Sequence, residues 1–183
     1  MHRARKVYLA GPEVFLPAAD DIGRRKKKLD AQYGFEGLYP LDSALSADPS
    51  LDRLDARIYR ANLALIHAAD FGIANLTPFR GLSADVGTVF ELGLFVGLGK
   101  PVFGYTNETD DLAWRVWREL PNGDGMMIED FGNADNLMID MALAEQGHPI
   151  LRHAAASDAR LRDLTAFEEC LKRAATAFGS DSA

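Results

Sequence analysis

The chain has only one cysteine, Cys170, among its 183 residues. A single cysteine excludes an intramolecular disulfide and a zinc site built from several thiolates. The four histidines, His2, His67, His148 and His153, are not paired at the spacing with which helical residues bind a metal ion. We therefore expect no metal site and no cofactor.

Positive charge is also scarce. Twenty basic residues stand against 27 acidic ones, which gives a net charge of −7. This balance argues against a nucleic-acid polymer or an anionic membrane as a partner. No apolar run approaches the length of a membrane span, and the run after the basic N-terminus is too short for a signal peptide. We expect a soluble, cytoplasmic protein.

Glycine-rich nucleotide-binding loops are missing. The sequence GLGKP at 97–101 lacks the Ser or Thr that follows Lys in a P-loop, and no G-x-G-x-x-G follows an apolar strand. The length is sufficient for one domain with a sizeable core, and 48% of the residues are hydrophobic. We predict a single domain over residues 1–183, with a frayed tail from about residue 179.

Short apolar runs alternate with helical patterns along the chain. Apolar runs predict strands at 7–10, 35–41, 71–76 and 101–105, and a brief strand at 126–128. Helical patterns cover about 17–33, 51–68, 84–98, 135–147 and 157–178, and 110–120 is either a short helix or a packed loop. This alternation predicts a parallel sheet covered on both faces, which binds its ligand beyond the carboxyl ends of the strands.

Three of the helical patterns carry more detailed expectations. The charged helix at 17–33 is expected to be largely exposed. The apolar stripes predicted to face the core are Leu51, Leu54, Ile58, Ala61, Leu65 and Ala68 in the next helix, and Val86, Val89, Phe90, Leu94 and Leu98 in the one after it. Ser83 is the predicted N-cap of that third helix.

Two acids stand out in the sequence NLTPFRGLSADVGTVFELG at 75–93, because Asp85 and Glu91 lie six residues apart on an apolar helix. Each has an ordinary interpretation: Asp85 suits the positive end of the helix dipole, and Glu91 can be a solvated surface acid. The helix nevertheless follows a strand whose end faces the expected ligand crevice. Both carboxylates are therefore candidates for a site.

Three motifs, VYLAGPEVF, ADFGIANLTPFRGLSADVGTVFELGLFVGLGKPVFGY and DNLM, resemble the nucleoside 2-deoxyribosyltransferase family over residues 7–138. The resemblance implies a flavodoxin-like three-layer α/β sandwich with a central parallel sheet of about five strands. It also implies a homo-oligomer with pockets shared between subunits. The implied activity is transfer of 2-deoxyribose between the nucleobases of 2′-deoxynucleosides, by double displacement through a covalent glycosyl-glutamate intermediate.

The resemblance also assigns roles to residues. Glu91 is the implied nucleophile, Tyr8 orients it, and Asp70 helps to protonate the departing base. Asp85 binds a sugar hydroxyl, and Asn136 holds the 5′-hydroxyl in the pocket of a neighbouring subunit. The remaining residues of the predicted substrate-binding set, from the same motifs, are Gly11, Phe15 and Met138. No metal or cofactor is implied.

A carboxylate suits this chemistry, because it stabilises positive charge at C1′ and then captures the sugar covalently. Two other functions stay open. The first is hydrolysis of 2′-deoxynucleoside 5′-monophosphates, which Ser83 allows but Asp85 opposes, because a carboxylate repels a phosphate. The second is a non-catalytic nucleotide-sensing module, whose signature would be loss of Glu91. The segment 39–52 has no residue diagnostic of the base, so purine and pyrimidine exchange both stay possible.

Overall fold

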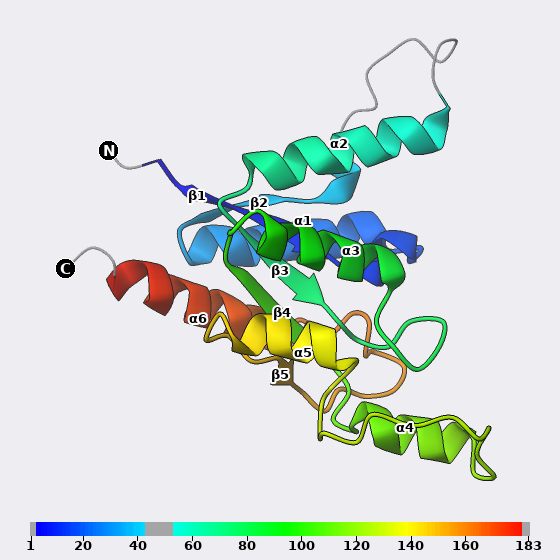
Figure 1. Cartoon of the computed structure of the whole chain (residues 1–183). Coiled ribbons are helices and arrows are strands. Elements are labelled where there is room, and N and C mark those ends of the chain that lie inside the picture. Colours follow the sequence, from blue (N-terminus) through cyan, green and yellow to red (C-terminus); the bar gives the residue numbers. More distant parts are fainter. Residues whose placement is uncertain (1–2, 43–52, 181–183) are drawn as a thin grey trace.

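The computed structural model of the chain describes residues 3–42 and 53–180 (Figure 1). A central sheet of five parallel strands runs in the order β2-β1-β3-β4-β5. The strands are β1 (Arg5–Ala10), β2 (Phe35–Leu38), β3 (Phe71–Asn75), β4 (Val102–Thr106) and β5 (Leu151–Arg152). The order reverses direction between β1 and β3, which is where sheets of this kind bind ligands. The predicted fold class is confirmed.

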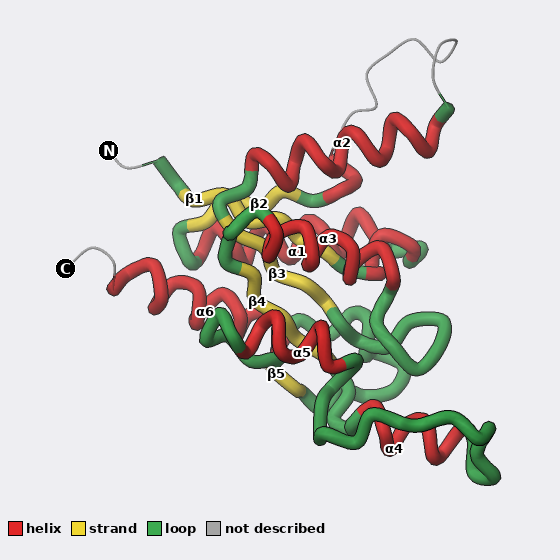
Figure 2. Tube along the Cα trace, viewed as in Figure 1, coloured by secondary structure: helices red, strands yellow, loops and turns green. Residues whose placement is uncertain are grey.

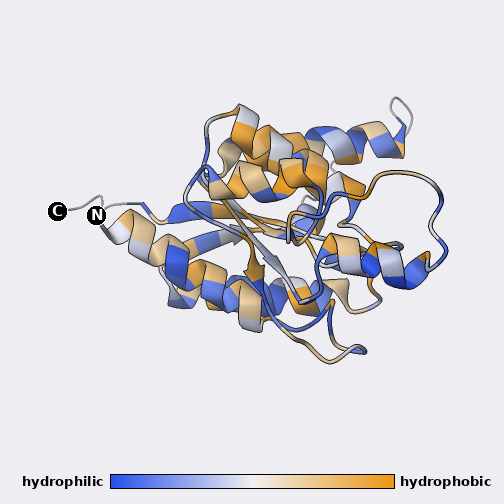
Figure 3. Cartoon of the chain, turned by 60° about the horizontal axis from the view of Figure 1, so that its bottom comes forward, coloured by the Kyte–Doolittle hydropathy of each residue, from blue (hydrophilic) through white to orange (hydrophobic). Residues whose placement is uncertain are grey.

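Helices cover both faces of the sheet, as Figure 2 shows, and the helices of both layers carry hydrophobic as well as hydrophilic residues (Figure 3). They are α1 (Ala19–Gln32), α2 (Leu54–Ala68), α3 (Val86–Gly97), α4 (Leu112–Glu119), α5 (Leu137–Ala144) and α6 (Thr165–Ser180), with short 3₁₀ helices at Pro12–Phe15 and Pro40–Asp42. One core cluster lies between the sheet and the helices α1 and α6, and the other lies between the sheet and α2, α3 and α5. Helix α4 projects beyond these layers (Figure 1).

The three central strands form the buried framework of the candidate site. All of β3 and β4 and the last four residues of β1 are buried. Alternate residues point to opposite faces of a strand. Leu9 of β1 therefore packs in the α1/α6 cluster, whereas Tyr8 packs in the cluster under α2, α3 and α5. The strand that the sequence predicted at 7–10 thus delivers Tyr8 to the face covered by α3.

Helix α1 is less exposed than the sequence predicted. Lys26 and Asp30 are fully buried on its inner side. Lys26 Nζ lies 2.6 Å from Glu13 Oε1, which also accepts hydrogen bonds from Asn75 Nδ2 and the Tyr105 hydroxyl. The long alkyl stem of a lysine allows it to pack in a core when its charge is paired. The charged pattern at 17–33 therefore includes a lysine, Lys26, whose charge is buried and paired.

The predicted apolar stripes of α2 and α3 are largely wrong, because much of each stripe faces outward. The large side chains of these stripes that are exposed are Leu54 and Ile58 on α2, Val86 and Phe90 on α3, and Leu98 just after α3. Leu51 lies outside the described residues. The side chains that α2 and α3 bury are Ile66, Thr88, Leu92 and Phe95. Both helices carry apolar residues on two faces, and periodicity alone does not say which face packs on the sheet.

Other differences concern the ends of elements. Residues 110–120 contain the helix α4, but 126–128 form no strand, and Met126 and Met127 are exposed. The last helix begins at Thr165 because turns occupy 157–162, and it runs to Ser180, past the predicted start of the frayed tail. The two-residue strand β5 was not predicted. None of the described helices is long and apolar enough to cross a membrane.

Candidate active site

A tyrosine and a glutamate meet where β1 passes under α3. The Tyr8 hydroxyl donates a hydrogen bond of 2.6 Å to Glu91 Oε1. Tyr8 is fully buried, and its ring contacts that of Phe95 with the centroids 6.0 Å apart. The packing holds the hydroxyl in place, and a donor held in this way fixes the orientation of the carboxylate.

The environment of Glu91 favours the neutral acid. The pKa of Glu91 is raised to about 7: burial raises it, the hydrogen bond from Tyr8 lowers it by less, and the nearby charge of Asp85 raises it. Burial and Glu91 together raise the pKa of Tyr8, so Tyr8 remains a proton-bearing donor. A half-buried carboxyl group with a pKa near neutrality is typical of a functional site.

A cavity of about 320 Å³ lies between α2 and α3, beside Glu91. Its lining residues are Tyr59, Asn62, Leu63 and Ile66 from α2, and Gly87, Phe90 and Glu91 from α3. Asn62 was not predicted. Its Oδ1 atom is buried and accepts no hydrogen bond from the described residues. An unpaired acceptor of this kind is costly unless a ligand or water supplies a donor. The signal in the sequence was a polar residue four positions before Ile66, on the same face of the helix.

Asp85, and not the predicted Ser83, is the N-cap of α3. Its Oδ2 atom accepts hydrogen bonds from Thr88 N at 2.9 Å and from Thr88 Oγ1 at 3.1 Å. The helix therefore sets the distance between Asp85 and Glu91, about 9 Å along its axis. Asp85 is close enough to raise the pKa of Glu91. Tyr8, Glu91 and Asp85 are thus brought together as the sequence suggested.

Asp70 lies at the other edge of the sheet. It immediately precedes β3, so it stands at the amino end of the strands, whereas Gly11 follows the carboxyl end of β1. Its carboxylate accepts hydrogen bonds from Arg3 Nη2 at 2.8 Å and from Lys6 N at 2.7 Å. Within the described residues, neither of these hydrogen bonds involves Tyr8 or Glu91. The structure does not bring this predicted catalytic residue to the candidate site.

Gly11 lies at the carboxyl edge of the sheet. Gly11 has an extended backbone, with φ 163°, that any residue can adopt, but a Cβ atom there would lie 1.9 Å from Glu13 Oε2. A side chain at position 11 would therefore force the carboxylate of Glu13, which is paired with Lys26, to move. The carboxylate of Glu13 can occupy this position only because residue 11 has no side chain.

Phe15 lies at the same edge, at the end of the 3₁₀ helix Pro12–Phe15. Its ring stacks on that of Phe79 at a centroid distance of 5.4 Å, and the guanidinium of Arg80 lies over both rings. Phe15 is 55% exposed. It is available to a ligand or partner at the rim, but it is not among the residues that line the cavity at Glu91.

Asn136 and Met138 stand at the start of α5. Asn136 Oδ1 accepts a hydrogen bond from Met138 N, so Asn136 is the N-cap, and its Nδ2 donates to Glu129. The Met138 side chain is 72% exposed. Neither residue lines the cavity at Glu91 in the same protomer. Both are displayed outward.

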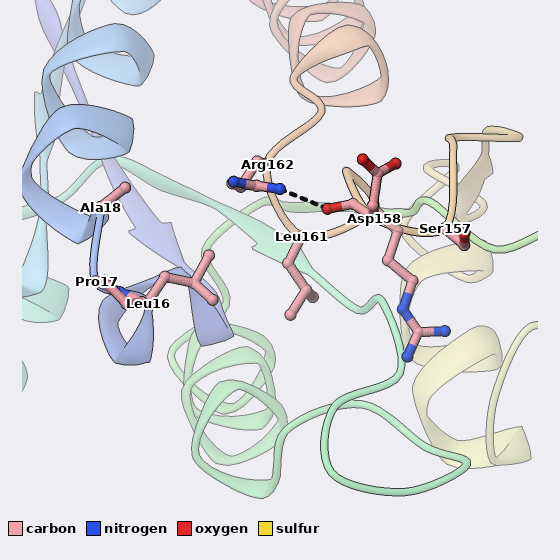
Figure 4. Close-up of a pocket in the computed structure, with 8 residues that line it drawn as sticks. Leu16, Pro17, Ala18, Ser157, Asp158, Leu161 and Arg162 are labelled. Carbon is pink, nitrogen blue, oxygen red and sulfur yellow. Dashed lines mark hydrogen bonds between the residues drawn. The ribbon is translucent and has the colours of Figure 1, made fainter.

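A second hollow lies on the other face of the sheet, between the start of α1 and the turns at 157–162 (Figure 4). Its lining residues are Leu16, Pro17, Ala18, Ser157, Asp158, Arg160, Leu161 and Arg162. None of the predicted site residues is among them. Within residues 3–42 and 53–180, no group of three or more His, Cys, Asp or Glu side chains is arranged to hold a metal ion.

The fold and the site define an α/β protein with a half-buried carboxyl group, that of Glu91, beside a small cavity. A model of the family "Nucleoside 2-deoxyribosyltransferase" matches residues 7–138 of the chain. The chain therefore belongs to the nucleoside 2-deoxyribosyltransferase family, and the resemblance seen in the sequence is confirmed.

Solved structures show the same fold. A 2-desoxiribosyltransferase from Leishmania mexicana is 27% identical, with a TM-score of 0.64 over 90% of this chain and 97% of that one. A 2-deoxyribosyltransferase from Bacillus psychrosaccharolyticus is 21% identical, with a TM-score of 0.50 over 89% and 95%.

An uncharacterised protein from Schizosaccharomyces pombe is 33% identical over 110 residues, which are 58% of this chain. The chain spans about half, 52%, of the length of this curated relative.

Proposed function

We propose that the protein transfers 2-deoxyribose from one nucleobase to another, with Glu91 as the nucleophile. The observation that carries the proposal is the 2.6 Å hydrogen bond from the Tyr8 hydroxyl to Glu91 Oε1, beside a cavity. Because Tyr8 binds one of the two carboxylate oxygens, the other is free to react. Membership of the family supports the same reaction.

The reaction proceeds in two displacements at C1′. In the first, an oxygen of ionised Glu91 forms a bond to C1′ while the bond from C1′ to the base nitrogen breaks. The base leaves with the bonding electron pair and takes a proton. In the second, a nitrogen of another base attacks C1′, Glu91 leaves as a carboxylate, and the incoming base loses its N–H proton. Two inversions give net retention of configuration.

The source of the proton for the departing base is not Asp70 in this proposal. Asp70 is engaged with Arg3 and with Lys6 N at the far edge of the sheet. Asn62 lines the cavity and offers a free amide oxygen, which suits an N–H group of a nucleobase. An amide is not an acid, so Asn62 holds the base and the proton comes from solvent.

We also propose that the protein is a homo-oligomer whose pockets are completed by a neighbour. Apolar side chains surround the mouth of the cavity, with Tyr59 at 52% and Phe90 at 57% exposure. Met138 and Asn136 are exposed and do not line their own cavity, so they are available to the pocket of another subunit. Closure by a second subunit would exclude water, which favours transfer over hydrolysis.

The competing hydrolase is less well supported. Its substrate carries a 5′-phosphate, and Asp85 stands close enough to Glu91 to raise the pKa of that residue. Two like charges 4 Å apart repel by about 4 kcal/mol at an effective dielectric constant of 20. The two acids therefore favour an uncharged nucleoside.

One incubation separates these functions. Purified protein is mixed with 2′-deoxyinosine, with and without adenine, and bases and nucleosides are separated. We expect 2′-deoxyadenosine and an equal amount of hypoxanthine when adenine is present. Hypoxanthine without 2′-deoxyadenosine would indicate hydrolysis, and the 5′-monophosphates would then be tested. No release from any purine or pyrimidine 2′-deoxynucleoside would contradict the proposed activity.

A further inference from the structure

The starts of α3 and α5 are joined directly, although they are 51 residues apart in the chain. Asp135 Oδ2 accepts a hydrogen bond of 2.8 Å from Ala84 N, and Asp135 Oδ1 accepts one from Asn136 N. Asp85 follows Ala84, and Asn136 follows Asp135. The buried carboxylate of Asp135, 2% exposed, therefore connects the backbones of the two helix N-caps.

Arg115 of α4 reinforces this junction. Its side chain is 3% exposed and donates three hydrogen bonds, each to a backbone carbonyl of a different segment. The acceptors are Leu82 O at 2.9 Å, Ala134 O at 2.7 Å and Asp110 O at 2.5 Å. Two of these carbonyls lie just before Asp85 and Asn136. Arg115 Nη2 also lies 3.9 Å from Asp135 Oδ2.

This arrangement is more than is needed to attach a surface helix. Burial lowers the pKa of Arg115, because removing its guanidinium from water costs free energy. A guanidinium has its donors in a rigid planar fork, so three carbonyls bound to it are fixed relative to one another. Figures 1 and 2 show α3 and α5 starting at the same end of the molecule, on the side from which α4 projects.

We propose that Arg115 and Asp135 are positioning residues that hold Asp85 and Asn136 in the orientation needed to bind the sugar hydroxyls. The inference rests on the proposed deoxyribosyl transfer. Neither residue touches the substrate, and each acts through the helix start beside it. Loss of the clamp formed by Arg115 and Asp135 should therefore weaken recognition of the hydroxyls more than it weakens the reaction itself.

The test compares two donors, 2′-deoxyinosine and its analogue without the 5′-hydroxyl. The ratio of their kcat/KM values measures recognition of that group, and a hydrogen bond to the neutral amide of Asn136 makes it about 10 in the wild type. In Arg115→Met we expect the ratio to fall to within about threefold of one, because the group that binds the hydroxyl is no longer fixed. Arg118→Met is the matched control, since Arg118 is on the same helix, is exposed, and forms an ion pair with Asp110.

The outcomes separate the inference from the proposed function. A wild type that transfers no deoxyribose overturns both. An active wild type whose ratio is unchanged in Arg115→Met, while both kcat/KM values fall equally, shows a merely structural role and overturns the inference alone. A wild-type ratio near one also overturns it. If Arg115→Met does not fold, Arg115→Lys and Asp135→Asn decide, with the ratio expected to fall in each.

Discussion

A buried glutamate, Glu13, and a half-buried one, Glu91, lie on opposite faces of the sheet, and their surroundings differ in one decisive respect. Glu13, 1% exposed, pairs with Lys26 at 2.6 Å, and the same oxygen accepts hydrogen bonds from Asn75 and Tyr105. Glu91 accepts one hydrogen bond, from Tyr8, and borders a cavity. The charge of Glu13 is balanced by a cation. Glu91 is held by a neutral donor and remains accessible from the cavity.

This difference separates a structural acid from a reactive one. An ion pair with three donors fixes a carboxylate and blocks its access to a ligand. A single neutral donor orients a carboxylate without cancelling its charge, so it remains able to attack C1′. The comparison predicts that changes at Glu91 affect chemistry, whereas changes at Glu13 affect folding.

The largest effect is expected from Glu91→Gln. Loss of a covalent nucleophile should lower deoxyribosyl transfer by about 10³-fold or more. The melting temperature should change little, because glutamine retains an acceptor for Tyr8. Glu13→Gln is the matched control, and it should lower the melting temperature while the folded protein keeps most of its activity. Activity of Glu91→Gln above about 1% of wild type would remove Glu91 from the nucleophile role.

The next largest effect concerns stability. Lys26→Met leaves Glu13 buried without its cation, so we expect a loss of about 3–5 kcal/mol in the free energy of unfolding. Urea denaturation measures this loss. The double variant Glu13→Gln/Lys26→Met should recover most of it, because a neutral pair of similar volume leaves no buried charge. A single variant as stable as wild type would show that the pair is dispensable.

A smaller effect is expected from Tyr8→Phe. Ionised Glu91 is the reactive form, so kcat/KM in the wild type should rise with pH through about 7. The Tyr8 hydrogen bond lowers the pKa of Glu91, so its loss should move the inflection to higher pH and reduce activity at neutral pH about tenfold. Asp85 raises that pKa, so Asp85→Asn should move the inflection to lower pH. Shifts in the same direction in both variants would contradict this assignment.

The smallest effect is expected at Asp30, a buried acid with neither a cation partner at bonding distance nor a cavity. Neither carboxylate oxygen has a hydrogen-bond partner among the described residues. Burial raises the pKa of Asp30 from 3.8 to about 7, although Lys26 and Lys27 oppose the shift. The folded state then binds more protons than the unfolded state between these values, so stability falls as pH rises from about 4 to 7.

Asp30→Asn should remove that decline. We expect it to be more stable than wild type above pH 7, with the difference shrinking as pH falls toward 4. Thermal melts over this range measure the trend. An advantage that grows as the pH falls would contradict the assignment.

Much of the fold could be predicted from the sequence, because buried parallel strands appear as continuous apolar runs. Val7–Ala10 and the run at 101–105 are clear cases, and both became central strands. The two-residue strand β5 is too short to produce such a run. The strand predicted at 126–128 fails because an apolar triplet does not show whether a neighbouring strand is available to pair with it.

The candidate site was predicted in part. Glu91, Tyr8 and Asp85 are found together, because the strand and helix that carry them are set by local patterns. Asp70 is found elsewhere, since proximity to a strand in sequence does not tell which end of the sheet a residue occupies. Asn62 was missed because its role depends on the packing of α2 against α3. No local pattern encodes that packing.

The close approach of Gly11 and Glu13 has a consequence for sequence change. A methyl group at position 11 would displace the glutamate, so the two positions cannot vary independently. In a library randomised at both positions and selected for growth on a deoxynucleoside, larger side chains at position 11 should be recovered only with shorter ones at position 13. Variants that lose the carboxylate at position 13 should also carry a neutral residue in place of Lys26. Positions 11, 13 and 26 should therefore change together.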